Sequence, residues 1–474
     1  MNTNQSAQKQ IRPIPIVISI MIGAFIGLFS ETALNMAFTN IMGDFGIDAT
    51  AVQWLTTGYL LVLGILVPVT ALLLQWFTTK QLFSASLLFS ICGTLVAALS
   101  PSFEILLMAR VIQAIGTGLL LPLMTNVILV IFPPHKRGTV MGMMGLVIMF
   151  APALGPTLSG LIVDSLGWQA IFWICLPLLV FTFGFGIVYM QNVSTITKPK
   201  IDILSIILST IGFGGIVFGF SSAGEGAGAW GEPGVFVPIT VGVVGLILFS
   251  IRQFKMKEPM LNLRVFKFPM FSLGLLMVFL GMMLILSASI LLPMYLKGGL
   301  LLSAAAAGFV LLPGGIVNGI MSPITGRLFD KFGPRYLVIP GFAITTVFAY
   351  LFSNVTTETS QMAVIIMHTG LFIGVAMIMM PSQTNGLNQL PRNFYPDGAA
   401  VMNTLQQIAG AIGTAVAVSI MSAGQASYMA ASNPNNPAAL AEAMTAGVQN
   451  AFLFALVASV IGLIVSFFIK RVEV

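Results

Sequence analysis

The chain has 474 residues, of which 57% are hydrophobic and only 7% are charged. Soluble domains carry about 25% charged residues, so the composition excludes a cytosolic enzyme, a secreted disulfide scaffold and a disordered tail. Two cysteines and two histidines are too few for a disulfide framework, a haem or a zinc cluster. We therefore expect an integral membrane protein that uses no metal and no cofactor.

Apolar runs between polar breaks predict the membrane-spanning helices, because each such helix needs about 20 mostly apolar residues. The sequence contains fourteen of these runs. In chain order they are residues 14–38, 51–76, 82–100, 104–132, 137–162, 168–190, 202–222, 235–251, 270–296, 304–326, 336–353, 361–385, 398–423 and 447–469. We predict an all-α membrane protein with fourteen transmembrane helices.

The basic residues test this number of spans independently, because Lys and Arg accumulate in cytoplasmic loops. With the N-terminus inside and the side alternating at each span, eighteen of the 20 basic residues fall inside, and the exceptions are Lys297 and Arg110. The net charge of +6 therefore reflects orientation rather than a nucleic-acid surface. Both termini are expected in the cytoplasm, and the first run is too long for a cleaved signal peptide.

An internal repeat divides the chain. Residues 68–80, PVTALLLQWFTTK, align without a gap with residues 323–335, PITGRLFDKFGPR. Both segments follow the second span of a six-span set, so we interpret spans 1–6 and 9–14 as duplicated halves. The expected domains are a six-helix bundle in 1–190, two inserted helices and a linker in 191–268, and a second six-helix bundle in 269–474. Repeated bundles around a midplane cavity are typical of secondary transporters.

Three motifs carry a resemblance to a known family. Residues 326–335, GRLFDKFGPR, resemble the signature cytoplasmic loop of the major facilitator superfamily, and residues 107–118, LMARVIQAIGTG, are similar to its fourth-span motif. Residues 155–160, GPTLSG, resemble the fifth-span signature of its antiporters. With fourteen spans, the resemblance narrows to the fourteen-span drug:proton antiporters of the lincomycin and multidrug exporter type. It implies the major facilitator fold.

The N-terminal copy of the signature loop departs from the family pattern. Ala71 and Thr78 stand where the family usually has glycine, and Gln75 replaces its aspartate. These departures argue against a gating role for the N-terminal copy.

Glu31 is the only acid deep inside a predicted span. Burying an ionised carboxylate in lipid costs several kcal/mol, so its side chain should face a cavity. Removal from water favours the protonated form, so the group can alternate between acid and carboxylate. The resemblance implies proton coupling here, since the family has an acid, usually aspartate, at this position before an asparagine. A carboxylate held by polar neighbours for packing alone is the alternative.

Arg110 is the only base inside a predicted span. A guanidinium group at this depth normally lines a polar interior. The resemblance implies a part in proton coupling, by tuning Glu31 or by holding the helices, and a structural clamp on backbone carbonyls is an equal alternative. We expect Asn35 and Gln113 to line the substrate cavity.

Two further motifs are interpreted through the resemblance. Gly155, Pro156 and Gly160 are expected to form the antiporter hinge or seal between the halves, with ordinary packing of small residues as the alternative. The charged loop around Asp330 is expected to latch one conformation as a cytoplasmic gate, with a solvated turn as the alternative. The gate residues are Gly326, Asp330, Gly333 and Arg335.

The function expected is proton-coupled efflux of lipophilic or cationic drugs by alternating access. A proton from outside neutralises Glu31 and displaces the drug, and its return supplies about 2.3 kcal/mol per 100 mV of membrane potential. The partners expected are small-molecule drugs, protons and the lipid bilayer, without nucleic acid. We expect a monomeric, multi-pass protein of the bacterial cytoplasmic membrane.

Other functions remain as alternatives. An exporter of a specific endogenous metabolite, peptide or lipid has the same sequence features, whereas an importer is disfavoured by the fifth-span motif. A channel or receptor is disfavoured because no filter-like repeated loop and no signalling domain occur in the sequence. A membrane enzyme is disfavoured by the single intramembrane acid and the lack of a metal constellation.

Overall fold

The structure is a computed structural model that describes residues 13–47, 49–194, 196–198, 201–224, 229–432 and 438–472. Within these ranges all the regular elements are helices. The N-terminal bundle contains α1 (Pro13–Ala33), η1 (Leu34–Ala37), α2 (Phe38–Phe45), α3 (Ala49–Trp76), α4 (Thr79–Ala98), α5 (Phe103–Ile131), α6 (Pro134–Leu166) and α7 (Gln169–Tyr189). The middle segment contains α8 (Ile203–Gly224), η2 (Ala229–Gly231), α9 (Pro233–Lys255) and η3 (Leu263–Lys267). The C-terminal bundle contains α10 (Pro269–Met294), η4 (Tyr295–Gly299), α11 (Ala304–Phe332), α12 (Arg335–Phe352), α13 (Gln361–Asn388), η5 (Arg392–Phe394), α14 (Tyr395–Ala431) and α15 (Ala439–Ser466).

Each of the fourteen predicted spans coincides with one long helix. In the described part of the chain, thirteen helices are long and apolar enough to cross a membrane. The remaining run, 137–162, coincides with α6, a helix of 33 residues that includes five residues whose side chains lie outside the described set. The shortest predicted run, 235–251, proved to be the 23-residue helix α9.

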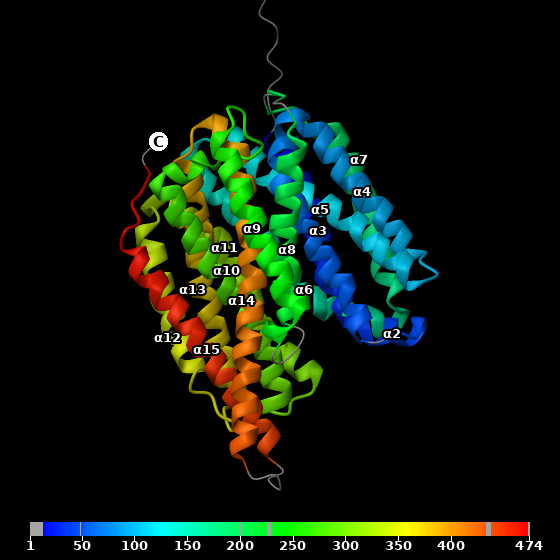
Figure 1. Cartoon of the computed structure of the whole chain (residues 1–474), viewed down its shortest axis with the longest axis vertical. Helices are drawn as coiled ribbons and strands as arrows, with labels where there is room; N and C mark the ends of the chain where they lie inside the picture. The colour runs from blue at the N-terminus through cyan, green and yellow to red at the C-terminus, as the bar shows by residue number, and fades with distance from the viewer. Residues whose placement is uncertain are drawn as a thin grey trace, which may run out of the picture.

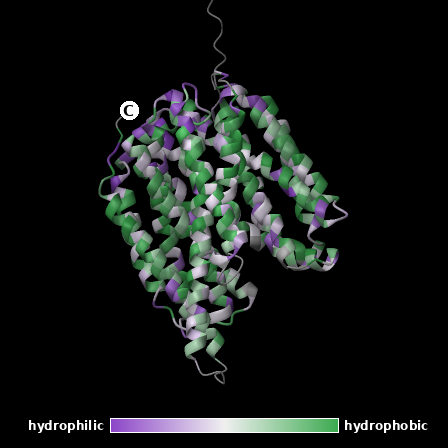
Figure 2. Cartoon of the chain, viewed as in Figure 1, coloured by the Kyte–Doolittle hydropathy of each residue, from purple (hydrophilic) through white to green (hydrophobic). Residues whose placement is uncertain are grey.

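Hydrophilic residues gather at the end of the molecule where α15 ends, at the top of Figure 2, and apolar residues dominate the helices below it. We call this end the terminal face, because α1 begins and α15 ends on it, and we call the other end the opposite face. α14 ends and α15 begins on the opposite face, at the bottom of Figure 1.

The helices pack into two bundles. In the N-terminal bundle, α1 lies against α5, α6 and α7, while α4 lies against α5 and α7. In the C-terminal bundle, α10 lies against α13, α14 and α15, while α12 lies against α13 and α15. Lipid is as apolar as the helix surfaces, so small residues that allow close approach determine these contacts. For example, α4 and α5 meet where a Cβ atom on Gly93 would lie only 2.8 Å from the Ala109 carbonyl oxygen.

The bundles meet along two seams. One seam joins α6 to α11, and the other joins α3 and α5 to α14. In the first seam, a Cβ atom on Gly326 would overlap the carbonyl oxygen of Gly138, and one on Gly142 would lie 2.5 Å from the carbonyl oxygen of Ser322. Backbone therefore touches backbone where α6 crosses α11.

The inserted helices α8 and α9 form a hairpin over the second seam. α8 packs on both α3 and α14, so it bridges the two bundles, and α8 and α9 lie in front of this seam in Figure 1. At the terminal face, Arg252 of α9 donates to Asp202 through Nε at 2.6 Å and Nη2 at 2.9 Å. These hydrogen bonds lower the pKa of Asp202 to about 2, so the carboxylate stays charged at neutral pH and the hairpin stays closed at its base.

The contact between α8 and α9 predicts a stability effect. A Cβ atom on Gly242 would lie 2.7 Å from the Ile216 backbone nitrogen, so Gly242→Ala must push the two helices apart. We expect the substitution to cost about 1–3 kcal/mol of unfolding free energy and to lower the melting temperature of the purified protein.

The matched control is Gly184→Ala, since Gly184 lies in the helix α7 with nothing within 4 Å of a Cβ atom. Equal melting temperatures for the two variants would contradict the close packing of α8 on α9.

Candidate functional site

Arg110 is fully buried inside the N-terminal bundle and ties three helices together. From α5 its Nη1 donates to the backbone carbonyl of Ser30 in α1 at 3.2 Å, and its Nε donates to the carbonyl of Leu55 in α3 at 3.4 Å. Its Nη2 donates to the carbonyl of Glu31 at 3.4 Å. A planar guanidinium with five fixed donors suits such a clamp better than an ammonium would.

Aromatic and polar side chains complete the surroundings of Arg110. The guanidinium carbon lies 4.4 Å from the centre of the Tyr59 ring, a cation–π geometry. The Tyr59 hydroxyl is 2.7 Å from the Thr117 hydroxyl. Gln113 accepts from Arg110 Nη1 at 2.9 Å and donates to the Thr94 hydroxyl at 2.9 Å. The Arg110 guanidinium is thus surrounded by groups that accept its hydrogen bonds or stack against it.

A small cavity lies within this polar network. Its volume is about 10 Å³, and Ser30, Tyr59, Thr94, Gln113 and Thr117 are among the residues that line it. That volume is close to the minimum that holds one water, and the lining offers hydroxyl and amide partners. Polar side chains therefore extend from the last turns of α1 into the centre of the N-terminal bundle.

Glu31 lies in the last turn of α1, directly beside the clamp. Only its backbone carbonyl contacts Arg110, and its side chain is partly exposed. Among the described residues, no hydrogen bond or ion pair is found at its carboxylate, although the Arg110 charge acts on it through space. The α-helix then tightens into the 3₁₀ turn η1, which is common where a helix changes course.

The two predicted cavity residues lie apart. Asn35 is exposed on η1 and accepts from the Thr56 hydroxyl of α3 at 2.7 Å. Gln113 is 4% exposed and belongs to the Arg110 network inside the bundle. Asn35 is thus exposed just after the end of α1. Gln113 lies inside the bundle, beside the Arg110 guanidinium.

The fifth-span motif packs next to Glu31. A Cβ atom on Gly155 of α6 would overlap the Thr32 hydroxyl and lie 3.2 Å from the Ala33 backbone nitrogen. Gly155 therefore brings α6 against α1 within one bundle. α6 is a continuous helix through Pro156 and Gly160, and the contacts of these two residues lie outside the described set.

At the terminal face, Asp330 joins the C-terminal bundle to α6. Its Oδ1 accepts from the Gly138 backbone N–H at 2.8 Å, and its Oδ2 accepts from the Thr139 backbone N–H and hydroxyl, both at 2.7 Å. Hydrogen bonds to a charged acceptor are roughly twice as strong as neutral ones. Gly326 provides the close approach that brings the carboxylate within reach.

The other two expected gate residues shape the loop. Gly333 follows α11 at φ +80°, in the region that favours glycine, and so turns the chain into α12. Arg335 is exposed at the start of α12. Gly326 and Asp330 of α11 thus contact α6, whereas Gly333 lies in the turn after α11 and Arg335 begins α12.

Arg137 is a second buried arginine, although its place in the sequence indicates only one of the cytoplasmic basic residues. It is 3% exposed and donates to the Asn388 side chain at 2.9 Å and to the Tyr395 hydroxyl at 2.8 Å, both in the C-terminal bundle. It also donates to the Leu129 carbonyl at 2.6 Å. Arg137 and Asp330 thus each link the two bundles at the terminal face.

The N-terminal copy of the signature loop contacts the segment after α7 instead. The Gln75 backbone carbonyl accepts from the Thr197 and Lys198 N–H groups at 3.1 and 3.2 Å. Lys80 Nζ donates to the Ile187 carbonyl at 2.7 Å. Gln75, which stands where the family usually has an aspartate, therefore binds the segment that leads to the inserted helices. In the described residues, no group of His, Cys, Asp and Glu could hold a metal ion.

Comparison with known proteins agrees with this architecture. Residues 20–414 match the profile of the Major Facilitator Superfamily. The chain belongs to this superfamily, and its class is therefore that of transporters rather than enzymes.

Two curated relatives match along their full length. The lincomycin resistance protein LmrB of Bacillus subtilis is 67% identical over 475 residues, covering 100% of this chain and 99% of that protein. The lincomycin resistance protein LmrB of Listeria monocytogenes is 58% identical, covering 100% of both chains. The crystal structure of the human organic anion transporter MFSD10 shares the fold, with a TM-score of 0.69 at 14% identity over 96% of this chain and 100% of that one.

The contact between Asp330 and α6 predicts a change in access. Asp330→Asn removes the charged acceptor shared by Gly138 and Thr139, so the terminal face should open more often. A cysteine placed at Met141, which is 0% exposed on α6, should then react several-fold faster with an impermeant maleimide, in a chain whose Cys92 and Cys175 are replaced by serine.

Glu258→Gln is the matched control, because Glu258 is an exposed loop acid on the same face. If both variants label at the same rate, Asp330 does not hold the terminal face closed.

Proposed function

We propose that this protein exports lincomycin-like and other lipophilic drugs from the bacterial cytoplasm in exchange for protons. The observation that carries the proposal is the Glu31 carboxylate, which forms no ion pair with any described side chain. The Arg110 guanidinium beside it donates its hydrogen bonds to backbone carbonyls and neighbouring side chains. The names of the two lincomycin resistance relatives support the substrate class.

The membrane topology proposed has the terminal face in the cytoplasm. The distribution of basic residues supports this orientation. The chain then occupies the cytoplasmic membrane as a multi-pass monomer, with bundles 1–190 and 269–474 joined through 191–268. The conformation described here is closed at the cytoplasmic face by Asp330 and Arg137, and Glu31 belongs to the half that faces outside.

The absence of an ion pair or hydrogen bond at the Glu31 carboxylate among the described residues supports proton coupling there. In the outward conformation water reaches the carboxylate and a proton binds. A cationic or polar drug that was held by the charge loses its partner and leaves. Return to the inward conformation takes the neutral acid across the low-dielectric interior at a far smaller cost than the ion would incur. Release of the proton inside regenerates the charge for the next drug molecule.

Arg110 has a positioning part in this cycle. Its donors hold the carbonyl groups of Ser30, Glu31 and Leu55, which fixes the end of α1 against α3 and α5. Its positive charge also attracts the Glu31 carboxylate through space. Because Gly155 has no side chain, Thr32 packs directly on it, and α6 can move together with the end of α1.

The gate proposed at the cytoplasmic face works by exchange of partners. In the closed form Asp330 satisfies backbone N–H groups of α6, and Arg137 satisfies Asn388 and Tyr395. In the inward-open form these groups separate and water takes their place. Since both sets of hydrogen bonds are exchanged for others, the two conformations can have similar free energies, as alternating access requires.

The coupling residue is tested by drug-dependent proton release from energised everted membrane vesicles. Addition of lincomycin or a lipophilic cation should release protons in the wild type, and Glu31→Gln should reduce the release at least ten-fold because an amide cannot titrate. Glu104→Gln, which changes an exposed acid at the start of α5, should leave it intact. Full release from Glu31→Gln would show that the proton binds elsewhere.

The substrate class is tested by growth. Expression in a host without its own drug exporters should raise the minimal inhibitory concentration of lincomycin several-fold. The Glu31→Gln variant should confer none of this increase at equal membrane abundance. An unchanged inhibitory concentration for lincomycin and for a panel of lipophilic cations would reject drug export and favour an endogenous substrate.

A further inference from the structure

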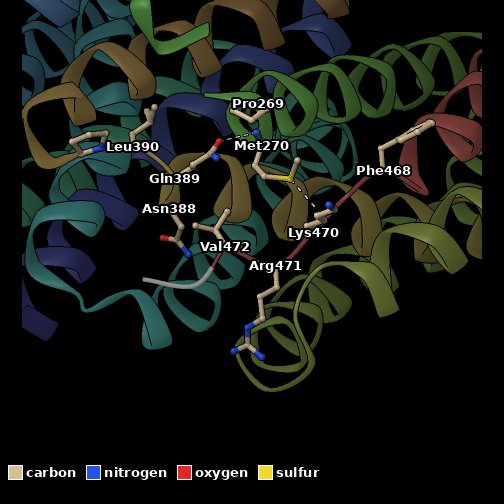
Figure 3. A pocket seen from close by; sticks show the side chains of 10 residues that line it. Pro269, Met270, Asn388, Gln389, Leu390, Phe468, Lys470, Arg471 and Val472 are labelled. Atoms are coloured by element: carbon tan, nitrogen blue, oxygen red, sulfur yellow. Dashed lines mark hydrogen bonds between the residues drawn. The ribbon is translucent and has the colours of Figure 1, made fainter. Parts of the chain in front are cut away.

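An open pocket of about 790 Å³ lies on the terminal face of the C-terminal bundle, away from Glu31. Such a volume lies within the roughly 300–1,000 Å³ typical of small-molecule sites. Three segments form it, namely the start of α10, the end of α13 with the residues after it, and the segment after α15 (Figure 3). The residues that line it are Pro269, Met270, Asn388, Gln389, Leu390, Pro391, Phe468, Lys470, Arg471 and Val472.

The pocket is a built feature of the fold. Asn385, which is 1% exposed, donates to the Lys470 carbonyl at 2.9 Å and accepts from the Val472 N–H at 3.2 Å. Gln389 accepts from the Met270 and Phe271 N–H groups at 2.7 and 3.2 Å. These bonds fix both walls, so the basic side chains project from an ordered frame.

The lining chemistry is basic and amphipathic. Lys470 and Arg471 provide two positive charges, and none of the ten described lining residues is acidic. Asn388 and Gln389 add amide groups, while Met270, Leu390 and Phe468 are apolar. Phe468 is 67% exposed and its neighbour Phe467 is 56% exposed, as is common for aromatic side chains at a membrane interface.

The depth of the pocket matches the headgroup layer of one leaflet. Spans α13 and α15 end beside it, at Asn388 and Ser466, and α10 begins beside it at Pro269. A group bound here sits where hydrocarbon gives way to water. Basic pockets at the ends of spanning helices are suited to anionic lipid headgroups.

We propose that this pocket binds the phosphate headgroup of an anionic phospholipid from the leaflet at the terminal face, with Lys470 and Arg471 as its cationic partners and the apolar rim against its acyl chains. The binding itself is independent of the proposed function.

Two contacts connect the bound lipid to the closed terminal face, and this part rests on the proposed function. Asn388 lines the pocket and accepts the hydrogen bond from Arg137 at 2.9 Å. Arg471 donates to the Asp330 and Lys331 carbonyls at 3.0 and 3.3 Å, at the end of α11. A lipid that orders these side chains stabilises the closed form over the open one.

The binding test uses the purified full-length protein in neutral detergent and measures the dissociation constant of dioctanoyl phosphatidylglycerol. We expect the affinity to exceed that for dioctanoyl phosphatidylcholine several-fold and to fall as salt rises. Lys470→Gln should weaken binding about five-fold, the effect of one basic residue. Lys257→Gln, which changes an exposed lysine of the same face outside the pocket, should not.

Three results would overturn the proposal. They are equal affinity for the two lipids, equal affinity in the two lysine variants, and displacement of the lipid by inorganic phosphate at similar concentration, which would make a free anion the occupant. The effect on the closed form is measured separately, as slower labelling of a cysteine at Met141 when phosphatidylglycerol is added. Neither assay uses drug or proton transport, so a failed Glu31 test leaves both results interpretable.

Discussion

The burial of the Arg110 guanidinium is the constraint on which the N-terminal bundle depends. A charge this deep must find all its partners within the chain, since the bilayer offers none. Carbonyl groups of α1 and α3, the Gln113 amide and the Tyr59 ring meet that requirement together. Because the partners come from different helices, the relative positions of those helices are fixed by one side chain. The Arg110 hydrogen bonds go to backbone carbonyls rather than to the Glu31 carboxylate, for which the described residues show no hydrogen bond or ion pair.

Close helix contacts impose the second constraint. Without a hydrophobic driving force between helices in lipid, packing depends on how near two backbones can come. Gly138, Gly142 and Gly326 serve the seam between the bundles, and Gly155 serves the contact of α6 with α1. One helix, α6, thus contacts its own bundle along one part of its length and the other bundle along another.

Much of the fold could be predicted from the sequence, because apolar length and the asymmetry of basic residues are local signals. All fourteen predicted runs coincide with helices. Asp330 contacts α6 of the other bundle, while its role as a gate stays a prediction. Burial of single residues could not be predicted. Arg137 looks like any loop base until its neighbours Asn388 and Tyr395, far away in sequence, are placed beside it. Gln113 was expected to line the substrate cavity, which stays a prediction. Its hydrogen bonds to Arg110 and Thr94 could not be predicted, because spacing along a helix does not show which partner each face meets.

The inserted hairpin makes the two seams unequal. α8 lies across α3 and α14, and α9 lies upon α8, so lipid tails are kept from that boundary between the bundles. The boundary of α6 with α11 has no such cover among the described helices. A compound dissolved in the bilayer therefore meets an uncovered boundary between the bundles on one side only. The two sides of the molecule therefore present different surfaces to the lipid.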